Sequence, residues 1–181
     1  MAEKMKFENE KTVELGTVDG DVLIKRCERL VPQQGDTIVV TGTLTVTDEL
    51  LIEGNLRVGR LEAKTRDKIT ITGDLYVDKS AIVKRGKLEI QGSAKAREIE
   101  AGSSLEVHQD LTCVSGRGGG SISVGGDAKA QKLSGGGSVK IDGAAEVGRV
   151  DAGGSAKIGG RCDCSEINVG GSVKVNVGKI Q

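Results

Sequence analysis

A repeat of 17 residues from Leu88 to Val175 constrains the fold of this chain more than any other feature. When the stretch is written in lines of 17, each of the first five lines ends on serine. A fixed period this short is typical of a solenoid, in which each repeat forms one turn of the chain. The lines begin at Leu88, Leu105, Ile122, Val139, Ala156 and Val173.

Each line contains three pairs of alternating apolar or glycine positions, which in the first line are Leu88/Ile90, Ala94/Ala96 and Ile99/Ala101. Each pair predicts a short strand with one face inward, and three strands per turn predict a triangular β-helix. A helical repeat would need apolar residues at three- and four-residue spacing over about a dozen residues. Here the alternation breaks every few residues at glycine, serine or asparagine, and glycine runs suit tight corners better than helices.

Steps of six residues extend the pattern upstream to Ile38 and Val40, with longer corners near residues 64–68 and 78–80. We therefore predict an all-β, single-stranded β-helix (solenoid) of about eight triangular turns, which forms the domain 37–181. Residues 1–36 do not fit the repeat, and we expect them to form an N-terminal tail and cap or an irregular first coil. A cap is expected because an open solenoid end exposes strand edges and core.

Composition excludes several functional classes. The chain has 26 basic and 26 acidic residues with interspersed signs, whereas nucleic-acid binding calls for a basic stripe, often with aromatic residues. Phe7 and Tyr76 are its only aromatic residues of the Phe, Tyr and Trp types. No apolar run approaches the roughly 20 residues of a membrane span. The charged start lacks the apolar core of a signal peptide, so we expect a cytoplasmic protein and doubt that it associates with membranes.

Signals for catalysis or metal binding are weak. The glycine runs are not followed by the Gly-Lys-Ser/Thr of a phosphate loop, and Gly125-Gly126-Asp127 is a single approach to a calcium repeat. Cys162 and Cys164 fall on inward positions and are predicted to be buried, reduced and metal-free. The single histidine, His108, is expected to be exposed to solvent. We expect no enzyme activity and no cofactor, and the outward carboxylates are expected to be solvated: Glu98, Glu100, Asp163 and Glu166.

Three segments of the chain resemble the sequences of bactofilins: Gly73–Val77, Gly92–Ile99 and Gly143–Val147. Bactofilins are polymer-forming cytoskeletal proteins. The likeness covers roughly Ile38 to Val175. It implies a right-handed β-helix that stacks end to end into nonpolar filaments without nucleotide. The partners that it implies are other copies of the chain and, beyond those, cytoskeletal or cell-envelope proteins.

A physical consideration also favours end-to-end assembly, because each terminal coil offers unpaired backbone and an apolar column to a partner rod. The register changes at the end of the repeat, where Val177 and Ile180 become the apolar residues. The expected polymerisation interface comprises Val173, Val175, Val177, Ile180, Ile38 and Val40.

Two other readings stay open. A passive β-helical scaffold would bind partner proteins along one face. A hexapeptide-repeat acyltransferase would need a left-handed helix with uniform 18-residue turns, and His108 would have to be its catalytic residue.

Overall fold

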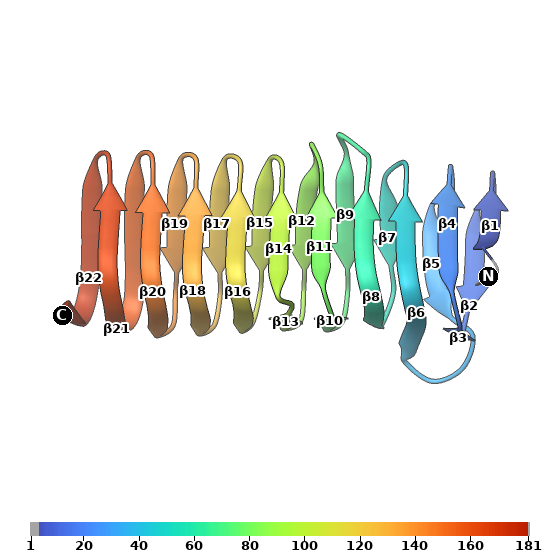
Figure 1. Ribbon diagram of the computed structural model, residues 1–181, viewed down its shortest axis with the longest axis horizontal. Helices are drawn as coiled ribbons and strands as arrows, with labels where there is room; N and C mark the ends of the chain where they lie inside the picture. The colour runs from blue at the N-terminus through green and yellow to red at the C-terminus, as the bar shows by residue number, and fades with distance from the viewer. Residues whose placement is uncertain (1–3, 181) are drawn as a thin grey trace.

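A computed structural model describes the backbone of residues 4–180 and the side chains of residues 4–176. The chain is an all-β parallel solenoid of about 10 turns, and none of the described residues is helical (Figure 1). The predicted fold class is confirmed. With a strand spacing of roughly 4.8 Å, the rod is about 48 Å long. The chain ends lie at opposite ends of the rod.

Three faces run along the rod, and each turn of the chain contributes one strand segment to each face. The first face is built from β1 (Lys4–Glu8), β4 (Asp21–Lys25), β11 (Ser80–Val83), β14 (Glu98–Ala101) and the ends of the longer strands β6 (Thr37–Val46), β8 (Asn55–Ala63), β16 (Leu111–Gly118), β18 (Ala128–Gly135), β20 (Ala145–Ala152) and β21 (Ser155–Val169).

The other two faces follow from the same register. The second face is built from β2 (Thr12–Leu15), β5 (Arg29–Pro32), β7 (Leu50–Ile52), β9 (Lys68–Ile71), β12 (Lys87–Ile90), β15 (Ser104–Val107), β17 (Ser121–Val124), β19 (Ser138–Ile141) and the starts of β21 and β22 (Ser172–Ile180). The third face is built from β3 (Thr17–Val18), β10 (Leu75–Val77), β13 (Ala94–Lys95), the starts of β6, β8, β16, β18 and β20, the middle of β21 and the end of β22.

Alternation along each strand places two inward columns along every face. Leu105, Ile122 and Val139 stack in register on the second face, and each is at most 1% exposed. In each strand, the polar residue between the two inward positions points to solvent, as the period of two requires. The expected inward and outward positions of the repeat are therefore confirmed for the side chains that the structure describes.

Residues 4–36 form the first coils of the same solenoid, which agrees with the irregular first coil that the sequence left open as one alternative. Strand pairing continues across residue 37, since β3 and β4 both pair with β6, and β5 pairs with β7. The first coils escaped detection because the spacing between paired residues changes from 17, as in Thr12 with Arg29, to 22, as in Val22 with Leu44. Two corners of these coils begin at residues with left-handed backbone, Asn9 (φ 63°) and Arg26 (φ 51°). The added coils also explain why the rod has more turns than the eight expected.

A ladder of side-chain acceptors holds the corner between the second and third faces. Asp74 Oδ1 accepts a hydrogen bond from the Ser93 amide (2.8 Å), and Asp127 Oδ1 accepts one from the Ala144 amide (2.7 Å). Asp110 Oδ1 likewise accepts from the Asp127 amide. A Cβ on Gly143 would lie 2.3 Å from Asp127 Oδ1, so glycine makes room for the carboxylate below it. Gly126-Asp127 is therefore part of this structural ladder.

Candidate assembly surfaces: the rod ends and an axial groove

The N-terminal end of the rod buries most of its inward apolar side chains. Val13 and Leu15 are each 3% exposed although they lie in the first coil, and Phe7 packs against the core beside them. Met5, which is in register with the buried Val22, is 47% exposed. Among the described residues, this end therefore buries most of its core but leaves Met5 exposed to solvent.

The C-terminal end leaves its column open. Val173 is 48% exposed, whereas Ala156 and Val139, which precede it in the same column, are at most 2% exposed. Val175 is half-buried, and Ile167 and Val169 are partly buried against the core. Within the described chain, β22 pairs with β21 alone, so its outer backbone edge has no partner strand.

The six residues expected at a polymerisation interface fall into three groups. Val173 and Val175 lie in the last coil, at the open end. Val177 and Ile180 belong to the backbone of β22, and their side chains lie outside the described residues.

Ile38 and Val40 do not lie at an end. Both are 0% exposed, and their strand β6 is stacked between β3 and β8. Their expected place at a terminal coil is wrong because residues 4–36 add coils in front of them.

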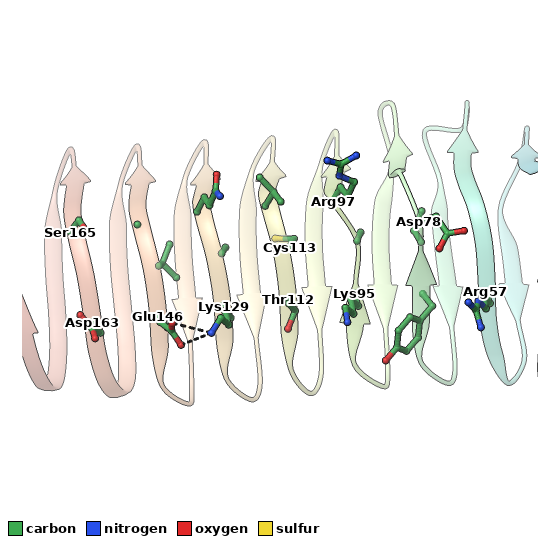
Figure 2. Close-up of a pocket in the computed structure, with 18 residues that line it drawn as sticks. Arg57, Asp78, Lys95, Arg97, Thr112, Cys113, Lys129, Glu146, Asp163 and Ser165 are labelled. Atoms are coloured by element: carbon green, nitrogen blue, oxygen red, sulfur yellow. Dashed lines mark hydrogen bonds and ion pairs between the residues drawn. The ribbon is translucent and has the colours of Figure 1, made fainter.

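An axial groove of about 890 Å³ runs along the third face across several turns (Figure 2). One wall is the row of outward side chains of the third face, which includes Tyr76, Lys95, Thr112, Lys129, Glu146 and Asp163. The other wall is the row at the corner leading to the first face: Asp78, Arg97, Val114, Gln131, Gly148 and Ser165. The floor between the walls consists of small or short inward side chains: Val77, Ala96, Cys113, Ala130 and Val147.

The groove changes its charge along the rod. Arg57, Lys95 and Arg97 line the part nearer the N-terminus, where the Lys95 ammonium lies 5.9 Å from the centre of the Tyr76 ring. Glu146 and Asp163 line the part nearer the C-terminus, and Glu146 pairs with Lys129 at 3.0 Å.

The repeat also contains a signal for this groove that we did not predict from the sequence. Small residues recur at one inward position, beside an outward row of polar residues 17 apart.

The cysteines are buried, as expected. Cys162 and Cys164 lie in the core with their Sγ atoms 2.9 Å apart. Burial raises the pKa of Cys164 to about 12, and the hydrogen bond with Cys162 contributes in the same direction. Burial also raises the pKa of Cys113, in the groove floor, to about 12. Such thiols carry almost no thiolate at neutral pH. That they are reduced and metal-free stays a prediction.

The remaining candidates are spread over different faces. His108 is exposed, and its Nε2 lies 3.4 Å from Glu106 Oε1. Glu166 is held in an exposed ion-pair network with Arg149, and Asp163 lines the groove on the third face. The part of the chain that the structure describes has no group of three or more His, Cys, Asp or Glu side chains placed to hold a metal ion.

For the same residues, the structure contains no apolar helix of membrane-spanning length. Comparison with known proteins identifies no relative of this chain. No family model matches it, and neither a curated protein nor a solved structure matches it at the significance required.

Proposed function

We propose that this protein is a structural, cytoskeletal element that assembles end to end into filaments without nucleotide. The observation that carries the proposal is the open C-terminal end, where Val173 is 48% exposed although the preceding side chains of its column are buried. Exposed apolar surface next to an unpaired strand edge is the usual signature of a docking surface for another strand. The resemblance to bactofilins supports the same function.

The two ends differ, and the difference suggests how filaments would form. Two C-terminal ends meeting across a two-fold axis would bury Val173 and Val175 of both copies in one isologous contact. A second contact between N-terminal ends, through Met5, would then link such pairs into a filament without polarity. The first contact should be the stronger one, because the N-terminal end already covers its own core.

The experiment replaces Val175 with aspartate. A charge buried without a partner costs several kcal/mol, so the C-terminal contact should fail and filaments should disappear, leaving dimers at most. The rod itself should stay folded because a terminal coil contacts only one neighbour. Sedimentation and negative-stain microscopy measure assembly, and circular dichroism measures folding.

Two further variants sharpen the result. Ser123→Asp introduces the same charge on the second face in the middle of the rod and should leave filaments intact. Met5→Asp removes the contact between N-terminal ends and should leave pairs joined through their C-terminal ends. Normal filaments from folded Val175→Asp protein, or assembly that requires ATP or GTP, would rule out this function.

A passive scaffold is the second candidate, and the groove favours it. The groove has a volume of about 890 Å³ and an apolar floor, as binding sites commonly do. Assembly through the rod ends does not use it. For this function, purified protein would form only discrete oligomers in light scattering, and filaments would be absent at every concentration.

A further inference from the structure

We propose that the axial groove of the third face receives a corner of a second copy of this chain, so that rods associate side by side in the same direction. This lateral contact goes beyond end-to-end stacking and does not require it. The inserted corner is the glycine edge, which we define as the exposed pairs at the junction of the first and second faces: Gly119–Gly120, Gly136–Gly137, Gly153–Gly154 and Gly170–Gly171.

Part of the glycine edge lacks side chains that its backbone could accommodate. The first residue of each pair must be glycine, because a Cβ on Gly136 would lie 2.0 Å from the Gly119 carbonyl oxygen. The second residue is less restricted in the first two pairs. A Cβ on Gly120 or Gly137 would lie 3.0 Å from the nearest backbone oxygen, and one turn earlier Ser103 occupies the same place. The corresponding distance shortens to 2.9 Å at Gly154 and 2.4 Å at Gly171. Repeated glycine there leaves a narrow edge of backbone with no side chains.

The groove offers a matching shape. Ala96, Cys113 and Ala130 make its floor, and each is 7–8% exposed, so an approaching backbone can reach the apolar column between the two walls. Close contact between small side chains and bare backbone resembles the packing of protein interiors. Wider edges could not enter as deeply, and the other corners of the rod carry the aspartate ladder or the groove itself.

The charges also match when the two rods point the same way. In that orientation the second face of the inserted copy lies against the third face of the receiving copy. The second face carries Lys140 and Lys157 in the same turns in which the third face carries Glu146 and Asp163. Reversing one rod would instead place its first face against these carboxylates. Complementary charge of this kind sets orientation and register.

Both carboxylates have neighbours of their own chain. Glu146 pairs with Lys129 at 3.0 Å, and the position beside Asp163 in β22 is Lys179, whose side chain lies outside the described residues. Lys140 Nζ lies 3.1 Å from Asp142. Exposed ion pairs like these contribute little to stability. Their side chains can therefore pair with a second copy instead.

The test uses charge exchange in the whole chain carrying both Val175→Asp and Met5→Asp, so that stacking through either end is absent. Lys157→Glu and Asp163→Lys should each weaken lateral association by about three- to tenfold, measured as a dissociation constant by sedimentation at low salt. The double variant should restore it. Gly120→Gln with Gly137→Gln should abolish it, while Glu98→Lys on the first face serves as the matched control and should have no effect.

The outcomes separate this contact from the proposed filaments. Lateral oligomers that respond to the exchange support the contact, whether or not wild-type protein forms filaments. Single rods at all concentrations, or a double variant that stays as weak as the single ones, would overturn it. Loss of association in Gly120→Gln/Gly137→Gln counts in its favour only if circular dichroism shows that the variant is folded.

Discussion

The two halves of the rod build the same coil in different ways. Before Leu88, residues paired between neighbouring turns lie 17 to 22 positions apart, as in Lys4 with Asp21 and Val22 with Leu44. After Leu88 the corresponding separation is 17, as in Asp127 to Asp110 and Ala144 to Asp127. The first half therefore tolerates corners of different length, whereas the second half repeats one corner.

Their cores differ in the same sense. One inward column of the third face contains Ile38, Leu56 and Leu75 in the first half. In the second half it contains mostly smaller residues: Ala94, Leu111, Ala128, Ala145 and Cys162. All eight are at most 3% exposed. Bulky side chains can fill coils whose corners vary, while small ones require the coil to close tightly at every turn. Regularity of sequence is thus a requirement of the slim half, and the following variants test that comparison.

The largest effect is expected at a glycine corner of the second half. Gly136→Ala should lower the free energy of unfolding by about 3 kcal/mol or more, because its Cβ would lie 2.0 Å from a backbone oxygen that cannot move without shifting the turn below. Gly137→Ala is the matched control, with a corresponding distance of 3.0 Å, and should change stability by about 1 kcal/mol or less. Urea unfolding measures both, and equal effects would contradict the tight closure of this corner.

A pair of core variants compares the two packing modes directly. Leu75→Ala should cost about 2–5 kcal/mol, because it leaves a cavity in a bulky coil. Ala128→Leu should cost about 1–3 kcal/mol, because the slim coil has no room for the larger side chain. Thermal and urea unfolding provide the measurements. If Ala128→Leu proved stabilising, the second half would be loosely filled rather than tightly closed.

A smaller effect is expected from the aspartate ladder. Asp127→Ala removes the acceptor for the Ala144 amide and should cost about 1 kcal/mol. Asp142→Ala is its control, since that side chain makes only an exposed pair with Lys140 and should cost about 0.5 kcal/mol or less. Chemical denaturation of both variants shows whether the aspartate ladder contributes more to the free energy of unfolding than an ordinary surface ion pair does.

The smallest effect concerns acid and the first coil. Hydrogen bonds from Lys25 and Lys6 lower the pKa of Glu8 from 4.5 to about 2. Because the folded-state pKa is depressed, the contribution of Glu8 is complete above about pH 4.5 and is lost as the pH falls toward 2.

We therefore expect β1 to lose amide-exchange protection at pH 3 relative to pH 6, after correction for intrinsic rates, while β12 keeps its protection. Glu8→Gln should remove the difference, and a β1 that responds to pH in that variant would refute this origin.

The fold class and the inward and outward positions of the second half could be predicted from the repeat alone. Leu105, Ile122 and Val139 recur at a period that only a stacked coil satisfies, and the structure buries all three. The repeat also predicted correctly that Cys162 and Cys164 lie in the core, because an inward position in a period-two strand is set by local geometry.

Tertiary structure alone decided which coils are terminal and what covers them. Residues 4–36 keep the 17-residue spacing only for their first turn before it lengthens to 22. Pairing with later coils nevertheless gives them a register, and this moves Ile38 and Val40 from a supposed end into the interior. The groove and the contrast between a covered and an open end likewise depend on side chains brought together from separate turns. Periodicity specifies how one turn lies on the next, but the exposure of a turn depends on whether another turn lies beyond it.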